Sequence, residues 1–169
     1  MKRFHKVDDH VFRGGEPSLK DLDMLKNEFG IDTVLSLDGN VAEKIANKCK
    51  DLGLKHLVMP IDGSNPSDGI QDVIENLDLI FDKKSKVYVH CLHGKDRTGL
   101  VCAMYKITNG TPFNEAFKEA VSIGMGQGFD KELEHKYYDV LFDFKNNKND
   151  TNDSDSIVDI QRGKRDLER

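Results

Sequence analysis

The chain has 169 residues, enough for one domain with a substantial hydrophobic core. Charged residues make up 33% and the net charge is −5, with no basic stripe, so we expect no nucleic-acid partner. No apolar run approaches the ~20 residues that span a bilayer, and the basic N-terminus lacks a following apolar region, so we expect neither stable membrane insertion nor a secretory signal.

Signals for strands and helices alternate along the chain. Runs of β-branched and apolar residues predict strands over residues 11–12, 31–37, 54–59 and 87–90. Apolar residues at helical spacing predict helices over residues 19–29, 40–52, 68–82, 100–105 and 130–143, with a further helix that begins at residues 111–112. Such alternation predicts an α/β fold with a mostly parallel central sheet and helices on both faces.

Several helix ends carry specific signals. Ser18 and Asn40 have side chains that can accept a hydrogen bond from the first turn, so each is expected to cap a helix. Thr111 followed by Pro112 reads as a cap and a first helical residue. The helix that follows is expected to bury its larger apolar side chains, namely Phe113, Phe117 and Val121.

The composition changes after Phe144. Residues 145–169 are rich in Lys, Asn, Asp and Ser and contain few apolar residues. Such a segment cannot bury enough apolar surface to offset the entropy of ordering. We therefore predict one domain over residues 1–144 and a disordered, charged tail over residues 145–169.

The number and spacing of the cysteines and histidines indicate neither a disulfide framework nor a metal site. Three cysteines, an odd number, favour a reducing, cytoplasmic compartment over a disulfide scaffold. The six histidines are scattered, and no pair of Cys/His clusters has zinc spacing, so we expect no metal. The sequence carries no signal for an oligomeric state.

Residues 90–97 read His-Cys-Leu-His-Gly-Lys-Asp-Arg and lie between a predicted strand and a predicted helix. This order builds an anion cradle, because loop N–H groups point inward and the helix N-terminus adds partial positive charge. Cys91 is the expected nucleophile, since these groups and Arg97 favour its thiolate. Arg97 can bind two phosphate oxygens at once. The segment therefore predicts phosphoester hydrolysis through a cysteinyl-phosphate.

Other residues of this segment have supporting roles in the prediction. His90 is expected to hold the loop by hydrogen bonds to backbone, and Thr98 to donate its hydroxyl to the sulfur when the thiolate departs. Two cations at the rim, His93 and Lys95, would suit a substrate with several phosphates. The expected substrate-binding residues are Leu92, His93, Gly94, Lys95, Asp96 and Arg97.

This loop resembles the signature of the cysteine-dependent protein tyrosine and dual-specificity phosphatases, which is His-Cys, five residues, then Arg-Ser/Thr. The run HGKDRTGL is similar to compact bacterial and viral dual-specificity-like enzymes and to bacterial enzymes that act on phosphotyrosine and phosphoinositides. The segment Phe-Arg-Gly-Gly-Glu-Pro, residues 12–17, resembles the Tyr-Arg-Ser-Gly-Gln-Pro element of such small enzymes. The resemblance implies a metal-independent, cofactor-free phosphomonoester hydrolase with a strand, P-loop and helix, and a structural Arg13 packed near the sheet edge.

Three aspartates are candidates for the general acid. The resemblance implies an aspartate from a loop upstream of the cysteine, and Asp62 follows an apolar strand at a suitable separation. Asp68 is the rival, although Ser67 and Asp68 also read as helix-start residues. Asp96 could instead orient Arg97 or transfer the proton itself. Asp62 is favoured, and the alternative for each is an ordinary loop aspartate that caps a turn.

The sequence leaves alternatives for the substrate and for the functional class of the protein. The substrate is a phosphorylated protein or, on the same scaffold, an inositol phosphate or phosphoinositide. A non-catalytic phosphate-binding module is a different class, disfavoured because Cys91, Arg97 and a candidate acid are all present. A sulfurtransferase or arsenate reductase is remote. Gln127 reads first as part of a flexible connection between helices and second as a rim contact.

Overall fold

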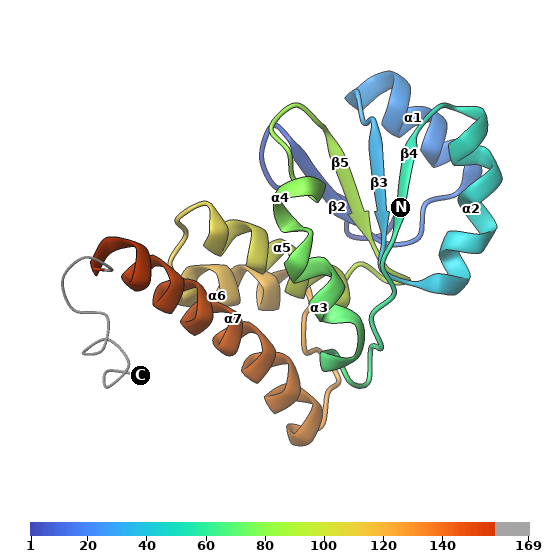
Figure 1. Cartoon of the computed structure of the whole chain (residues 1–169). Helices are drawn as coiled ribbons and strands as arrows, with labels where there is room; N and C mark the ends of the chain where they lie inside the picture. Colours follow the sequence, from blue (N-terminus) through green and yellow to red (C-terminus); the bar gives the residue numbers. More distant parts are fainter. Residues whose placement is uncertain (158–169) are drawn as a thin grey trace.

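A computed structural model describes the backbone of residues 1–157 and the side chains of residues 1–148. Its five strands are β1 (His5–Lys6), β2 (Val11–Gly14), β3 (Thr33–Ser36), β4 (Lys55–Val58) and β5 (Val87–His90). They form one sheet in the order β1-β2-β5-β3-β4 (Figure 1). All neighbours are parallel except β1 and β2. The predicted mostly parallel sheet is confirmed, and β1 is an addition that the sequence did not indicate.

Helices cover both faces of this sheet (Figure 1). On one face lie α1 (Leu19–Phe29) and α2 (Gly39–Asp51), whose buried side chains share a core with Val34 and Tyr88 of the strands. The remaining helices are α3 (Ser67–Glu75), α4 (Leu77–Ile80), α5 (Arg97–Thr108), α6 (Phe113–Ile123) and α7 (Lys131–Ile157). Helix α5 is buried along nearly its whole length and contacts β5, α6 and α7, so its N-terminus is held at the end of the central strand.

The first two helices begin at acceptor side chains. The Ser18 hydroxyl accepts the Asp21 N–H at 2.9 Å, and the Asp21 carboxylate accepts the Ser18 N–H at 2.9 Å, which confirms the predicted cap of α1. The predicted cap of α2 at Asn40 is wrong. Asp38 is the cap, and its carboxylate accepts the Val41 N–H at 3.0 Å. The cap therefore lies two residues earlier than predicted, and the helix begins at Gly39.

The single helix predicted over residues 68–82 is wrong. Two shorter helices, α3 and α4, replace it, with a break at Asn76. Inside α3, Asp68 and Gly69 leave helical geometry, and Gly69 has a φ of 106°. A Cβ at position 69 would lie 2.1 Å from the Pro60 carbonyl oxygen, so this close approach requires glycine. The periodicity of apolar residues did not reveal this tertiary contact.

Helix α6 differs from its prediction in cap and in buried face. Pro112 occupies the cap position with an extended backbone and no side-chain hydrogen bond, so the predicted cap by Thr111 is wrong. The buried residues are Ala116 and Ala120, which are 1% and 2% exposed. Val121 is 47% exposed, contrary to the prediction, and Phe113 and Phe117 are half-buried. Small residues face inward because α5 packs closely against α6.

The last helix includes part of the segment predicted to be a disordered tail. Helix α7 continues through Ile157, well beyond the domain boundary that the change in composition placed at Phe144. Asparagine, aspartate and lysine are poor core residues but are compatible with an exposed helix. Residues 145–157 belong to this helix, residues 158–169 lie outside the described part of the chain, and the disordered tail stays a prediction.

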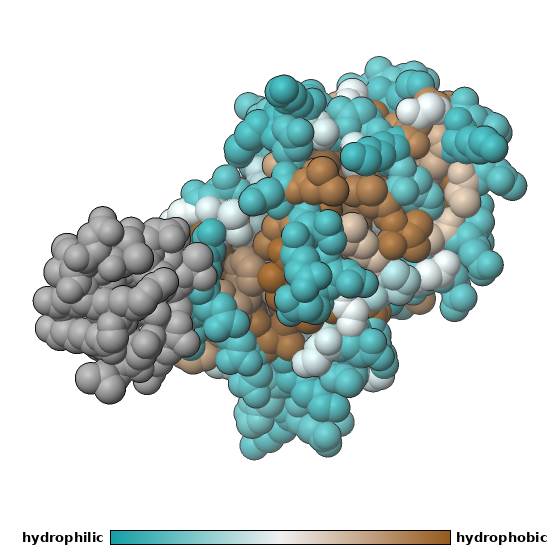
Figure 2. Space-filling model, viewed as in Figure 1, coloured by the Kyte–Doolittle hydropathy of each residue, from teal (hydrophilic) through white to brown (hydrophobic). Residues whose placement is uncertain are grey.

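The face of the molecule shown in Figure 2 is mostly hydrophilic, and hydrophobic residues are visible near α4. Leu79 of α4 is 60% exposed, and Val58, at the end of the edge strand β4, is 47% exposed. Single exposed apolar side chains are normal on folded proteins. Among the helices of the described residues, none combines the length and apolar character needed to cross a membrane.

Candidate active site

The loop of residues 91–96, which we call the phosphate loop, connects β5 to α5. Cys91 is 2% exposed and lies directly after the central strand. Its Sγ accepts hydrogen bonds from the Gly94 N–H at 3.3 Å and from the Thr98 hydroxyl at 3.0 Å. Both donors point at the place where negative charge on the sulfur would lie. The structure thus brings Cys91, Gly94 and Thr98 together as the sequence predicted.

The N-terminus of α5 is available to an anion. Asp96 stands at its cap position, yet its side chain makes no capping hydrogen bond. The Asp96 carboxylate instead accepts the N–H of Gly126 at 2.9 Å. The first-turn N–H groups of α5 are therefore left without a side-chain cap, which is the arrangement that binds phosphate. Asp96 ties the phosphate loop to the segment that precedes α7.

Arg97 is held by a residue that the sequence reading missed. Its Nη2 lies 3.2 Å from the Asp38 carboxylate, and its Nη1 donates to the Ile61 carbonyl oxygen at 3.4 Å. Burial alone would raise the pKa of Asp38, but the Val41 N–H and the Arg97 guanidinium outweigh it and lower that pKa. Asp38 therefore stays ionised and orients Arg97, the role that was considered for Asp96. Its place after a β-strand at the carboxyl edge was the available signal.

Arg13 supports the phosphate loop from behind. It lies on β2, the strand next to the edge strand β1, and its side chain is 2% exposed. Its Nη2 donates to the Gly94 carbonyl oxygen at 2.9 Å. Gly94 has a φ of 75°, and a Cβ there would lie 2.5 Å from the Gly14 carbonyl carbon. Glycine is therefore required where the loop touches β2.

His90 is wholly buried beneath the nucleophile. Its Nδ1 lies 3.1 Å from the Cys91 carbonyl oxygen, so the ring donates to the backbone of the phosphate loop. Burial lowers the pKa of His90 to about 4, which keeps the imidazole neutral near pH 7. The predicted supporting contact to nearby backbone is present in the structure.

Asp62 lies on an exposed loop after β4. Its carboxylate accepts the Ser64 N–H at 2.9 Å and the Ser64 hydroxyl at 2.8 Å, and these hydrogen bonds lower the pKa of Asp62. The adjacent Gly63 lies against Arg97, since a Cβ at position 63 would be 3.4 Å from Nε. The Gly63 carbonyl accepts the Tyr137 hydroxyl at 2.8 Å. The loop is thus placed beside Arg97, with Asp62 in a turn of its own.

Asp68 serves the same loop through its backbone. Its carbonyl oxygen accepts the Asp62 N–H at 3.0 Å, and its N–H donates to the Asn65 carbonyl at 2.8 Å. The residue reads from the sequence as a helix start, but its backbone is extended and α3 has no side-chain cap. Asp68 therefore closes the turn that contains Asp62.

The rim of the phosphate loop is cationic and partly exposed. Leu92 and His93 are exposed, and Lys95 is half-buried. Lys95 Nζ lies 3.5 Å from the Gln127 amide oxygen, which is the rim contact given as the second interpretation of Gln127. Arg3 donates from Nη1 to the His93 carbonyl at 3.1 Å. The sequence reading missed Arg3, which comes from the N-terminal segment and carries no motif.

Comparison with known proteins places this loop in a family. A family model described as "Tc-R-P: Polymorphic toxin system, DSP-PTPase phosphatase" matches residues 10–111, more than half of the chain. The matched span includes β2, the Asp62 loop and the whole phosphate loop. The chain belongs to this family. The predicted resemblance to cysteine-dependent dual-specificity-like phosphatases is therefore confirmed.

One relative and two solved structures extend the comparison. The protein-tyrosine-phosphatase MKP1 of Arabidopsis thaliana is 30% identical over 122 residues, which span 69% of this chain and 15% of that protein. TpbA of P. aeruginosa, in complex with pTyr, has a TM-score of 0.67 at 18% identity and covers 85% of this chain and 88% of its own. The core catalytic domain of the PP-IP phosphatase SIW14 of S. cerevisiae has a TM-score of 0.66 at 17% identity. The match covers 79% of this chain and 82% of that domain's chain. Both structures confirm the α/β fold.

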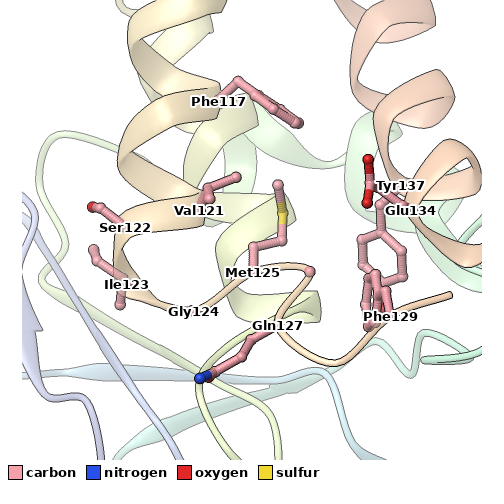
Figure 3. Close-up of a pocket in the computed structure, with 11 residues that line it drawn as sticks. Phe117, Val121, Ser122, Ile123, Gly124, Met125, Gln127, Phe129, Glu134 and Tyr137 are labelled. Atoms are coloured by element: carbon pink, nitrogen blue, oxygen red, sulfur yellow. The ribbon is translucent and has the colours of Figure 1, made fainter. Parts of the chain in front are cut away.

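A pocket of about 570 Å³ lies beyond the residues matched by the phosphatase family model (Figure 3). In Figure 3, Phe117 of α6 and Tyr137 of α7 stand on opposite walls, and Gln127 points away from the cavity. The segment from Gly124 to Gln127 forms its border towards the phosphate loop, through the contacts of Gly126 and Gln127 already given. The pocket is thus a neighbour of the cradle rather than part of it.

The other two cysteines differ from the candidate nucleophile. Cys49 and Cys102 are buried, and burial raises the pKa of each thiol to about 11. Among the described residues, neither of these two sulfurs accepts a hydrogen bond of the kind that Cys91 accepts. Within the described residues, no group of three or more His, Cys, Asp or Glu side chains is arranged to hold a metal ion.

Proposed function

We propose that this chain hydrolyses phosphomonoesters through a cysteinyl-phosphate on Cys91. The observation that carries the proposal is the sulfur itself, which accepts hydrogen bonds from Gly94 N–H and Thr98 Oγ1. The uncapped N-terminus of α5 and Arg97 supply positive charge around the place that a phosphate would occupy. Arg97 and the loop amides would stabilise the equatorial oxygens of the transferring group.

The first step forms a sulfur–phosphorus bond and breaks the bond from phosphorus to the leaving oxygen. The electron pair of the broken bond goes to that oxygen, which takes a proton from Asp62. The pKa of Asp62 is lowered in the free protein, but a phosphate dianion beside the carboxylate would raise it. The exposed position of the Asp62 loop after β4, next to Arg97, supports this role.

The second step returns the enzyme to its starting state. Water attacks phosphorus, the Asp62 carboxylate takes a proton from the water, and the sulfur–phosphorus bond breaks. The electron pair returns to Sγ, where the Thr98 hydroxyl and Gly94 N–H stabilise the thiolate. Inorganic phosphate leaves, and the proton on Asp62 is ready for the next turnover.

The substrate we propose is a phosphorylated residue of a protein, and the cationic rim supports an inositol phosphate or phosphoinositide as the second candidate. Arg3 and Lys95 carry charges that no described carboxylate pairs with at this rim. Parallel assays with phosphotyrosine and phosphothreonine peptides and with inositol polyphosphates would separate the candidates. A kcat/KM for the inositol polyphosphate higher than for every peptide would favour the second.

A reducing, cytoplasmic location is part of the proposal. It is supported by the three free cysteines, because a thiolate nucleophile such as Cys91 is inactivated by oxidation. Fractionation of cells that express the tagged full chain would test this location.

The mechanism is tested by trapping the intermediate. The purified protein is mixed with an aryl phosphate, quenched in acid and examined by mass spectrometry of its peptides. We expect a phosphate group on Cys91 in the wild type and none in Cys91→Ser, whose turnover falls by at least about a thousandfold. Aryl phosphate hydrolysis without any phosphorus on sulfur would refute the mechanism, as would full activity of Cys91→Ser.

A further inference from the structure

Three polar side chains form a line across the sheet towards Cys91. Ser36 Oγ lies 2.8 Å from His56 Nε2 and 2.6 Å from His90 Nε2. The strands β4, β3 and β5 that carry these residues are neighbours, and the register places all three on the face covered by α1 and α2. Ser36 and His90 are fully buried, while His56 is half-buried on the edge strand. The line therefore runs from the edge of the molecule to the nucleophile.

The hydrogen atoms in this line have one consistent direction. His90 Nδ1 faces the Cys91 carbonyl oxygen, which can only accept, so the Nδ1 of the neutral ring carries the proton. Its Nε2 is then an acceptor and must receive the Ser36 hydroxyl proton. Ser36 has no second proton, so its oxygen accepts from His56 Nε2–H. Each donor thus points towards the Cys91 carbonyl.

These polar residues lie on a face of the sheet that is otherwise packed with apolar side chains, so packing alone does not explain them. The same face carries Val34 and Tyr88 in one hydrophobic cluster. A buried polar group on such a face costs free energy unless it is hydrogen-bonded, and an apolar residue there would avoid the cost. The groups that act electrostatically on His90 are His56 of the same line and the site residues Asp38 and Arg97. The line therefore connects to the phosphate loop.

We propose that Ser36 and His56 are positioning residues for the reaction at Cys91, acting through the ring of His90. Ser36 fixes the tautomer and orientation of His90, and His56 fixes the hydroxyl of Ser36. The ring in turn holds the Cys91 carbonyl, and with it the turn that aims Gly94 N–H at the sulfur. The activity measurement for this proposal rests on the proposed function. The reactivity of the Cys91 thiol gives a second measurement that does not depend on that function.

Activity is measured first, as kcat and KM for an aryl phosphate. Ser36→Ala leaves His90 Nε2 without a donor, and we expect kcat to fall about tenfold with KM little changed. His56→Leu removes one donor further away, and we expect about a threefold fall in kcat. His56→Gln keeps an N–H donor and should restore the wild-type kcat. Lys55→Leu, on the same strand and exposed, is the control for position 56.

Thiol reactivity is measured second, as the rate of Cys91 alkylation by iodoacetamide against pH. We expect the midpoint of the profile to move to higher pH in Ser36→Ala, because the loop N–H is aimed less well at the sulfur. Thr33→Val is the matched control, since Thr33 is a buried hydroxyl of β3 on the opposite face that bonds Asp32. Its thermal stability should fall while its alkylation profile stays at the wild-type midpoint.

The two readouts separate two kinds of failure. A wild type that alkylates normally but releases no phosphate would refute the proposed function and leave this inference open to the alkylation test. An unchanged profile and kcat in Ser36→Ala, or an equal change in Thr33→Val, would overturn the inference. Failure of His56→Gln to exceed His56→Leu would remove His56 from it.

Discussion

The nucleophile side and the proton-donor side of the candidate site are held in different ways. Cys91 follows the central strand β5 and is 2% exposed, and its loop is fixed by Arg13, His90 and Thr98. Asp62 follows the edge strand β4 on an exposed loop, which is held by its own turn and by Tyr137. An anion cradle must be preorganised, whereas a proton donor must approach and leave the substrate. The fold places the anion cradle after the central strand β5 and the proton donor after the edge strand β4.

After Cys91→Ser, the largest effect is expected on the preorganised side, from Arg97→Lys. Lysine cannot reproduce the planar fork that binds two phosphate oxygens and also faces Asp38. We expect kcat/KM for an aryl phosphate to fall by about 10²–10³. Asp38→Asn keeps Arg97 but removes the charge that orients it. Its kcat/KM should fall less than that of Arg97→Lys. Equal activity of Arg97→Lys and wild type would mean that the cradle does not depend on the guanidinium.

The next effect is expected on the proton-donor side, from Asp62→Ala. Loss of a general acid should lower kcat for an aryl phosphate by about a hundredfold or more. Asp68→Ala is the matched control, because Asp68 contributes only its backbone to the turn. A larger loss in Asp68→Ala or Asp96→Ala than in Asp62→Ala would move the proton role to that residue.

A smaller effect is expected from loosening the proton-donor loop alone. Tyr137→Phe removes the hydroxyl that binds the Gly63 carbonyl and keeps the buried ring. We expect kcat to fall by about threefold, the worth of one ordinary hydrogen bond. The alkylation profile of Cys91 should not move, because the phosphate loop is untouched. A shift in that profile would show that the two sides are coupled.

The pH dependence of stability sharpens the same contrast without affecting the chemistry. Burial lowers the pKa of His90 to about 4 from 6.5, so the unfolded chain binds more protons between these values. The contribution is fully present above about pH 6.5 and is lost as pH falls towards 4, about 3 kcal/mol in all and about 1 kcal/mol between pH 7.5 and 5.5. Urea unfolding at these two pH values would measure it. His90→Asn should flatten the difference, and the exposed His135→Gln should not.

Local signals were sufficient where the physics is local. The loop of residues 90–98 was predicted correctly in its order, because a strand, a tight loop and a helix N-terminus follow one another in sequence. The cap at Ser18 was found for the same reason, since its acceptor and donor are three residues apart. The alternation of strands and helices was enough for the α/β class and for the mostly parallel sheet.

Contacts between distant segments were not readable in this way. The pairing of Asp38 with Arg97, the support of Gly94 by Arg13 and the line from His56 to His90 all join residues that are far apart in the sequence. The kink at Gly69 and the alanine face of α6 arise from close approach to neighbouring elements. The amino-acid sequence by itself therefore determined which chemistry is present, through residue types at fixed spacing. Only the packed sheet decided which side chains hold that chemistry in place, because burial and strand order bring them together.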